Sequence, residues 1–204
     1  MPFGKIVRGR KFQQVLDGAR KVFLRDGFEG ASVDAIAQEA GVSKATLYSY
    51  FPEKRIMLIE VARVEFERLA DSAHSEVDLD LPAQELLENI AVVIAESVAS
   101  DFSVQVFRLA VAETPRFPAL GREYFRAGPG LLTDRIAILL QYLTARGELQ
   151  IDDIPLAAYQ FAELCTTKIH DLYQLGMGDQ LTAEDIRRIA ISGAGLFLRG
   201  YAPR

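Results

Sequence analysis

Residues 32–51 read SVDAIAQEAGVSKATLYSYF, two short amphipathic segments separated by a turn. Apolar residues of the first segment recur at the spacing of a helix face. Gly41 lets the chain reverse tightly, and Ser43 offers an oxygen that caps a second helix over 44–50. Two short helices joined in this way predict a helix-turn-helix, a motif whose second helix can enter the major groove of DNA.

The two sides of the second short helix differ in chemistry. Leu47 and Phe51 are expected in a small core with apolar residues of the preceding helices. The small Ala45 lets the opposite side approach a surface closely. The alternative to DNA binding is a three-helix unit with a purely structural role. Tyrosines are, however, unusual on an exposed helix that binds nothing. The outward side chains are Lys44, Thr46, Tyr48, Ser49 and Tyr50.

Helical spacing recurs on both sides of this motif, and strand signals are scarce. Before it, an amphipathic helix is expected to end near Gly27, and Ser32 is expected to cap the next helix. After it, Pro52 suits the first turn of a fourth helix that continues to about Ser72. Residues 72–82 then indicate a break.

Five more helices are expected in the rest of the chain. Gly128-Pro129-Gly130 should kink or split the third of them, and Gly147 and Gly176 should end helices. Thr182 and Asp185 resemble a capping box. The expected ranges are 83–99, 103–113, 118–146, 155–175 and 182–200.

Composition predicts a soluble protein of the cytoplasm. Of the 204 residues, 50% are hydrophobic and 25% are charged, values typical of globular domains. The single cysteine, Cys165, cannot form an internal disulfide, which fits a reducing compartment. Residues 1–10 lack the apolar core of a secretion signal, and no charge-free stretch approaches the roughly 18 residues of a membrane span.

The net charge of −5 is unevenly distributed. Residues 1–54 carry nine Lys and Arg against six Asp and Glu, whereas residues 55–204 carry fourteen against twenty-two. A basic head on an acidic body is the pattern expected when only the head approaches phosphates. The bias is modest and carries little weight alone.

The stretch Gly41–Phe51, with Lys54 behind it, resembles the signature of the TetR (tetracycline-repressor) family of transcription regulators. The similarity covers about residues 9–69, and Arg108–Pro118 resembles one subgroup of the family. The resemblance implies an all-α fold. A three-helix DNA-binding domain, 9–69, with its helix-turn-helix at 32–51, would precede a larger helical effector-binding and dimerisation domain at 83–204. Matching positions before the motif are Phe23, Gly27, Phe28, Ser32, Ile36, Ala37 and Ala40.

The resemblance also implies roles for matched residues. Lys44, Ala45 and Tyr50 would face bases, and Thr46 and Tyr48 would contact phosphates or a thymine methyl group. Ser32, and Lys54 at a helix N-terminus, would bind phosphates; a solvated charge is the less favoured alternative for Lys54. Basic residues near the N-terminus would form an arm on DNA or a solvated tail. The expected DNA-binding set is Ser32, Ser43, Lys44, Ala45, Thr46, Tyr48, Ser49, Tyr50 and Lys54; the arm is Lys5, Arg8, Arg10 and Lys11.

The second domain is rich in aromatic residues. Helix packing explains any one of them, but the resemblance adds an apolar cavity with a few polar groups that orient an effector. Cys165 is expected to be a small buried residue rather than a redox sensor. Candidates for the effector pocket are Phe107, Arg108, Glu113, Phe125, Gln141, Tyr142, Phe161, Glu163 and His170.

The last helices are expected to form a dimer surface, a four-helix bundle across a two-fold axis. Glycine there would allow close helix approach, although ordinary core packing within one chain remains the alternative. The stripe on the last helix consists of Ile186, Ile189, Ala190, Gly193 and Phe197.

Sequence patterns for catalysis are lacking. There is no complete G-x-G-x-x-G, no P-loop and no H-E-x-x-H, and neither His74 nor His170 has a neighbouring metal-ligand cluster. We therefore expect no catalytic residues, metal or cofactor. The expected protein is a homodimeric repressor that a small-molecule effector releases from a palindromic operator in double-stranded DNA. An activator, a small-molecule-binding helical protein or an adaptor are the alternatives.

Overall fold

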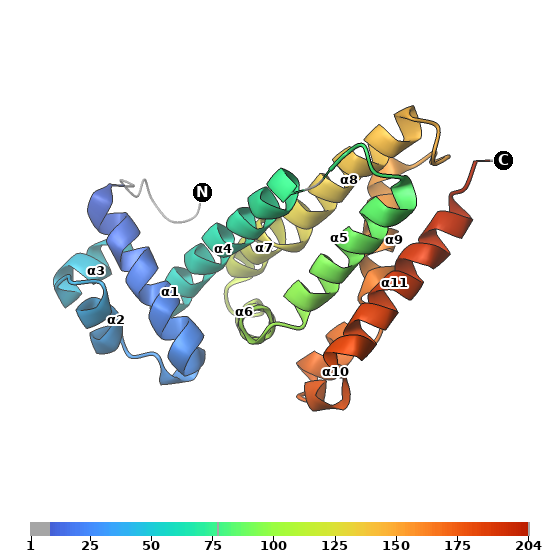
Figure 1. The fold of residues 1–204 in the computed structure, drawn as a ribbon. Coiled ribbons are helices and arrows are strands. Elements are labelled where there is room, and N and C mark those ends of the chain that lie inside the picture. Colours follow the sequence, from blue (N-terminus) through green and yellow to red (C-terminus); the bar gives the residue numbers. More distant parts are fainter. Residues whose placement is uncertain (1–8, 77, 204) are drawn as a thin grey trace. The chain divides into compact units, whose positions relative to one another are not determined.

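The computed structural model describes residues 9–76 and 78–203, and for 69–76 only the backbone. Throughout these residues the regular structure is helical, as the sequence predicts (Figure 1). The helices are α1 (Arg10–Gly30), α2 (Val33–Glu39), α3 (Lys44–Tyr50), α4 (Lys54–Glu76), α5 (Ala83–Val98), α6 (Asp101–Glu113), α7 (Pro118–Ala127), α8 (Pro129–Ala145), α9 (Ile154–Cys165), α10 (Ile169–Gln174) and α11 (Ala183–Gly200), with a short 3₁₀ helix, η1 (Gly178–Gln180), before α11.

The chain divides into two compact units. Unit 1 runs to Glu67 and takes in Gln105–Gly128, so that α1–α3 share a unit with most of α4, most of α6 and all of α7. Unit 2 consists of Arg68–Val104 and Pro129–Arg204. The sequence therefore returns to unit 1 after it has already entered unit 2.

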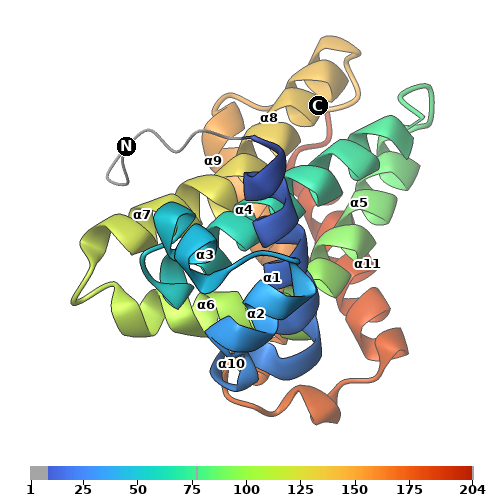
Figure 2. The same cartoon turned by 90° about the vertical axis from the view of Figure 1, so that its left-hand side faces the viewer.

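Close helix packing builds the first part of unit 1, where α1 lies beside α2 and α3 (Figure 2). A side chain at Gly18 would meet Ala40 at 2.7 Å, so glycine allows α1 to approach the end of α2. At Gly27 the backbone adopts φ +70°, a conformation that favours glycine, and this breaks α1 where the sequence predicts its end. The predicted core residues Leu47 and Phe51 are both buried, Phe51 stacked on Phe12.

Both short helices of the helix-turn-helix begin with the predicted serine caps. Ser32 Oγ accepts a hydrogen bond from Ala35 N–H at 3.0 Å, and Ser43 Oγ accepts one from Thr46 N–H at 3.1 Å. Gly41 lies between the helices with φ +64°, which permits the tight turn. These contacts are local, which is why the sequence alone predicts this segment well.

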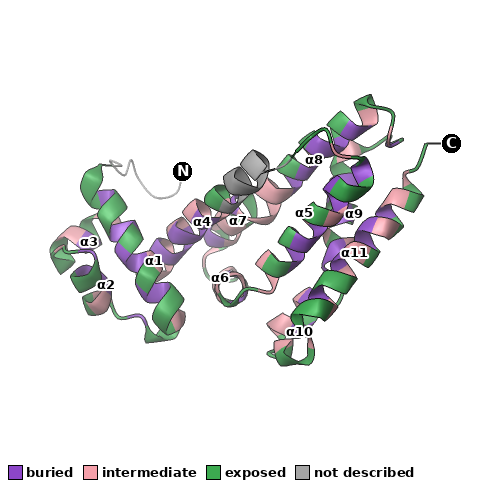
Figure 3. Cartoon of the chain, in the orientation of Figure 1, coloured by how far each residue is buried: buried purple, intermediate pink, exposed green. Residues whose placement is uncertain are grey.

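In unit 2, α11 packs against α5 and α9, and α8 packs on α9. Figure 3 shows the buried residues of these helices gathered where the helices face one another. Phe161 of α9 and Phe197 of α11 meet edge to face with ring centroids 5.1 Å apart. Cys165 is fully buried, and burial raises the pKa of its thiol to about 12, as suits a packing residue.

One predicted helix is wrong: 155–175 is two helices, α9 and α10. The hydroxyl of Thr166 donates to Ala162 O at 2.9 Å, and that of Thr167 donates to Glu163 O and Leu164 O, both at 3.1 Å. Such side-chain bonds compete with the helical ladder. Lys168, the residue directly before α10, adopts φ +69°, so α9 and α10 are not one continuous helix.

Other helix boundaries differ less. The predicted split near Gly128 is confirmed, since α7 ends at Ala127 and α8 begins at Pro129. Gly147 and Gly176 have φ +76° just beyond helices, as predicted. Pro52, however, precedes α4 rather than lying in its first turn, and α4 extends to Glu76 instead of ending near Ser72.

In the described part of the chain, no single helix is long and apolar enough to cross a membrane. The pair α5 and α6, bent by 63°, passes the same test of length and composition jointly. Burial explains the apolar character of α5, because Leu86, Leu87 and Ala91 belong to the core of unit 2.

The predicted capping box is present at the start of α11. Thr182 Oγ1 accepts from Asp185 N–H, and Asp185 Oδ2 accepts from Thr182 N–H, both at 3.1 Å. We expect Thr182→Ala to lower the free energy of unfolding by about 1 kcal/mol in urea titrations.

Hydrogen bonds from Thr182, and then from Arg188, lower the pKa of Asp185 from 3.8 to about 2. A carboxylate with a lowered folded pKa contributes stability above its unfolded pKa and loses it as pH falls towards the folded value. The stability difference between wild type and Asp185→Asn should therefore shrink between about pH 4 and pH 2. A constant difference over this range would contradict the assignment.

Candidate nucleic-acid interface

The outer side of α3 is a polar surface that ends in an exposed tyrosine. Tyr48 is 49% exposed, and Lys44, Ala45 and Ser49 are exposed on the same short helix. The Nζ of Lys44 pairs with Asp34 of α2, and both side chains remain more than half exposed. A surface ion pair of this kind is worth little, so Lys44 can exchange it for a nucleic-acid contact.

The small hydroxyl groups of this surface already have partners. Thr46 Oγ1 lies 2.9 Å from Ser43 Oγ, and the hydroxyl of Ser49 donates to Thr46 O at 2.7 Å. Ser43 and Ser49 thus stabilise the two ends of a seven-residue helix. Ser32 is exposed at the start of α2 and retains its hydroxyl proton for a phosphate.

Tyr50 is only partly available to a ligand. Its ring packs edge to face against Phe12 with centroids 5.7 Å apart, and the residue is half-buried. Tyr50 therefore contributes to packing in unit 1. The base-facing role implied by the resemblance stays a prediction.

Lys54 begins α4, as predicted, but its ammonium group is engaged within the chain. Nζ donates to the carbonyl oxygens of Phe28 at 2.6 Å and Ala31 at 3.0 Å, and lies 4.4 Å from the centre of the Phe28 ring. The ammonium group of Lys54 is thus neither solvated on all sides nor free of partners, as a lysine awaiting a phosphate would be.

Of the proposed basic arm, Lys5 and Arg8 lie outside the described residues. Arg10 and Lys11 are exposed in the first turn of α1. Their exposure is compatible both with an arm and with a solvated helix end.

Four of the expected effector-pocket residues, Phe107, Arg108, Glu113 and Phe125, lie in unit 1. Phe107 of α6 packs edge to face on Tyr124 of α7, whose ring also meets Phe66 of α4. Burial raises the pKa of Tyr124 to about 12. Glu113, at the end of α6, accepts a hydrogen bond from Arg55 at 3.1 Å, while Arg108 and Phe125 are exposed.

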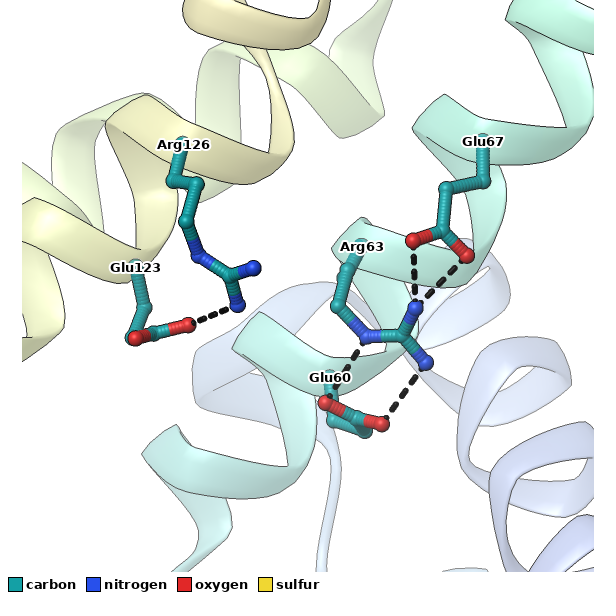
Figure 4. Close-up of polar contacts among 5 residues, drawn as sticks. All are labelled: Glu60, Arg63, Glu67, Glu123 and Arg126. Atoms are coloured by element: carbon teal, nitrogen blue, oxygen red, sulfur yellow. Dashed lines mark hydrogen bonds and ion pairs between the residues drawn. The ribbon is translucent and has the colours of Figure 1, made fainter. Parts of the chain in front are cut away.

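The helices α4 and α7 of unit 1 also carry pairs of charged residues within each helix (Figure 4). Arg63 is largely buried and donates to Glu60 at 2.8 Å and 3.1 Å and to Glu67 at 2.5 Å and 2.6 Å. These bonds, led by the one to Glu60, raise the pKa of Arg63 further above its ordinary value. Arg126 donates to Glu123 at 2.6 Å. Both arginines are satisfied by their own helices.

The other five expected pocket residues lie in unit 2. Phe161 is fully buried and packs in the core between α9 and α11. Gln141 and Tyr142 are exposed on α8, and Glu163 is exposed on α9. His170 is half-buried near the start of α10. In the described residues no three His, Cys, Asp or Glu side chains are placed to hold a metal ion.

Of the five residues expected in a dimer stripe on α11, four are buried within the single chain: Ile186, Ala190, Gly193 and Phe197. A side chain at Gly193 would lie 2.3 Å from Leu164 O, which shows that glycine serves the approach of α11 to α9. Ile189 is half-buried at the edge of the same core. The stripe is the intramolecular alternative that the sequence left open.

The outer side of the same two helices forms an open groove of about 440 Å³. Leu196 is 51% exposed on α11, and Leu156 and Tyr159 are similarly exposed on α9. Apolar residues occur on both sides of α11, so only burial in the structure distinguishes this exposed surface from the core side. The groove is lined by Gln160, Glu163, Leu164, Leu196, Phe197, Gly200 and Tyr201.

One polar contact of unit 1 has no counterpart in the sequence analysis. Gln105 of α6 accepts a hydrogen bond from Phe28 N–H at 3.2 Å, across 77 residues of sequence. No local pattern signals a contact at this separation.

Two family models match the sequence. The model described as "Bacterial regulatory proteins, tetR family" matches residues 15–61. The model described as "AefR-like transcriptional repressor, C-terminal domain" matches residues 85–203, more than half of the chain. The first match includes the whole helix-turn-helix, and the second begins in α5 and includes α11.

Curated relatives resemble only part of the chain. The chain is 32% identical over 92 residues to the "HTH-type transcriptional regulator LuxR" of Vibrio harveyi, and the aligned part covers 45% of each chain. It is 32% identical over 60 residues to the "HTH-type transcriptional repressor AcnR" of Corynebacterium efficiens, covering 29% of this chain and 32% of the relative. These relatives are thus matched over less than half of their length.

Solved structures match over nearly the whole chain. A putative TetR-family regulator from Mesorhizobium loti superposes with a TM-score of 0.83 at 24% identity, covering 97% of this chain and all of that one. "Flavonoid-responsive Regulator FrrA" is 33% identical, with a TM-score of 0.69, 96% of this chain covered and 99% of that chain. The first shows the shared fold, and the second adds sequence similarity over the same length.

Proposed function

Because the chain belongs to the tetR family of bacterial regulatory proteins, we propose that it is a sequence-specific, DNA-binding repressor of transcription that acts as a homodimer in the cytoplasm and responds to a small molecule. Residues 9–69 read DNA in this proposal, and residues 83–204 bind the effector and dimerise. The ranges of the two family matches support this division.

The observation that carries the proposal is the exposed polar side of α3 in a capped helix-turn-helix. On this one short helix Lys44 provides a positive charge and Tyr48 an aromatic hydroxyl group. The small side chain of Ala45 lets the helix approach DNA closely. An α-helix of this kind fits the major groove, where side chains meet base edges and phosphates. Ser32 at the start of α2 adds a phosphate contact, helped by the helix dipole.

For the dimer we propose the groove side of α9 and α11 as the contact surface. Leu156, Tyr159 and Leu196 are exposed apolar residues on two neighbouring helices, and a second copy of these helices would complete a four-helix bundle. A two-fold axis matches each surface with itself. The dimer then holds two α3 helices about 34–36 Å apart, the spacing of palindromic half-sites.

For the effector we propose a small, largely apolar molecule. The similar regulator FrrA is described as flavonoid-responsive, and it is 33% identical to this chain over nearly its full length. An effector that prefers one arrangement of the dimer shifts the population away from the spacing that fits DNA. Repressor release follows from that shift.

Tyr48→Ala tests the recognition surface with little risk to the fold, because the side chain is half exposed. We expect the Kd for operator DNA to rise roughly tenfold, the scale of one hydrogen bond to a charged group. All bound sequences should weaken alike, because phosphate contacts carry no sequence information. Fluorescence anisotropy titrations measure the change, and circular dichroism checks the fold.

Tyr48→Phe is the matched control, since it removes only the hydroxyl group. If the hydroxyl contacts a phosphate, Tyr48→Phe should lose most of the affinity that Tyr48→Ala loses. Unchanged affinity in both folded variants would remove Tyr48 from the interface.

A further inference from the structure

We propose that Lys54 and Gln105 are positioning residues for DNA recognition: together they clamp the turn between α1 and α2, and Lys54 acts through this clamp rather than by neutralising a phosphate. The inference rests on the proposed DNA-binding function. It concerns residues 27–31, which connect α1 to Ser32, the cap of α2.

Carbonyl groups at the C-terminus of a helix lack partners within the helix and carry partial negative charge. At the end of α1, Phe28 O and the carbonyl oxygen of the C-cap residue Ala31 accept hydrogen bonds from Lys54 Nζ at 2.6 Å and 3.0 Å. The ammonium group also lies over the Phe28 ring at 4.4 Å, within the range of a cation–π contact. Lys54 thus caps α1 from a segment 23 to 26 residues further along the chain.

The position of Lys54 in its own helix favours this arrangement. A positive charge at the first residue of α4 is opposed by the dipole of α4, which is positive at that end. Reaching the C-terminal carbonyls of α1 places the charge where a helix dipole favours it. Two of the three ammonium protons are used in this way, whereas the partner of Lys44 is an exposed carboxylate.

Gln105 binds the other backbone polar group of Phe28. Its Oε1 accepts the N–H of Phe28 at 3.2 Å, so both backbone polar groups of Phe28 are bound by side chains from distant segments. The preceding Gly27 has φ +70°, and a Cβ there would lie 3.1 Å from Gln105 Oε1. The turn is therefore shaped to receive the amide of Gln105.

The clamp fixes the start of the DNA-reading unit. Ala31, whose carbonyl Lys54 binds, directly precedes Ser32, and α2 packs on both α1 and α3. Releasing the turn would leave Ser32 and α2 free to shift relative to α4. A lysine in this role sets the geometry of DNA binding without contributing its own charge to it.

Hydrogen exchange in the absence of DNA tests the clamp directly. We expect Gln105→Met, which lacks the acceptor, to speed exchange of the Phe28 amide at least roughly tenfold. Gln105→Glu keeps an acceptor oxygen and should retain protection. Lys54→Met, which keeps the stem and removes the donors, should speed exchange of the amides of Ala31 and Ala35. Wild-type exchange rates in Gln105→Met or Lys54→Met would overturn the clamp.

The salt dependence of DNA binding separates the two roles of Lys54. A lysine that neutralises a phosphate contributes about 0.9 to the slope of log K against log salt. We expect Lys54→Met to weaken binding roughly tenfold at every salt concentration with an unchanged slope, as for the loss of one charge-assisted hydrogen bond. Lys44→Met, which removes an exposed charge from α3, should reduce the slope by about one unit.

A slope lowered by about one unit in Lys54→Met, with wild-type exchange in the turn, would make Lys54 a phosphate ligand and overturn the inference. Failure of the wild-type protein to bind any DNA would instead refute the proposed function, and the exchange experiment would still decide whether the clamp exists.

Discussion

Replacing Gly193 by alanine is expected to lower the free energy of unfolding by about 3 kcal/mol, the upper part of the range for overpacked cores. The new methyl group would lie 2.3 Å from Leu164 O and 2.9 Å from Cys165 N. Both atoms belong to the backbone of α9, so no side-chain rotation can relieve the contact. Urea unfolding followed by circular dichroism measures the loss.

Gly195→Ala is the matched control two residues further along α11. A Cβ there meets only the end of the Arg199 side chain, at 3.5 Å, an ordinary contact. Because glycine is unfavourable within a helix, this change should raise stability by about 0.5–1 kcal/mol. If both variants were stabilised alike, the packing of α11 on α9 described here would be wrong.

Leu196→Asp is expected to convert the dimer to monomers and to lower the affinity for a two-half-site operator roughly a hundredfold or more. Leu196 is 51% exposed in the single chain, so a charge there should leave the subunit folded. At the centre of a dimer surface, the same charge would be buried without a partner. Loss of the linkage between two heads removes an advantage of about 10²–10⁴ in affinity.

Light scattering gives the oligomeric state, and anisotropy titrations on full and half operators give the affinities. Leu175→Asp is the control: Leu175 is 73% exposed after α10 and does not line the groove. The control should remain dimeric with wild-type affinity. A dimeric Leu196→Asp protein with full operator affinity would place the dimer surface elsewhere.

Local signals made the helix-turn-helix predictable. Ser32, Gly41 and Ser43 act on residues within three or four positions of themselves, and the structure confirms all three. The capping box of α11 is confirmed for the same reason. In these segments the hydrogen bonds and turns that fix the backbone involve residues close together in the sequence, so the sequence alone predicts them.

Tertiary contacts set the limits of the prediction. The α11 stripe has the composition of an interface, but whether it meets a partner or α9 depends on how the helices of unit 2 associate. The role of Lys54 depends on carbonyl groups 23 and 26 residues earlier, and that of Gln105 on an amide 77 residues away. Between α9 and α10, the hydroxyls of Thr166 and Thr167 bond to the preceding turn and Lys168 has a positive φ. Two adjacent threonines in a sequence do not by themselves predict such a break.

Selection of bound sequences from random double-stranded DNA tests the central claim most directly. We expect enrichment of a palindromic site whose half-sites lie about one helical turn apart, because two α3 helices related by a two-fold axis would contact them. Lys44→Ala should relax the preference at one position in each half-site, whereas Tyr48→Ala should keep the consensus at lower affinity. Recovery of no enriched sequence by the folded wild-type dimer would contradict the account.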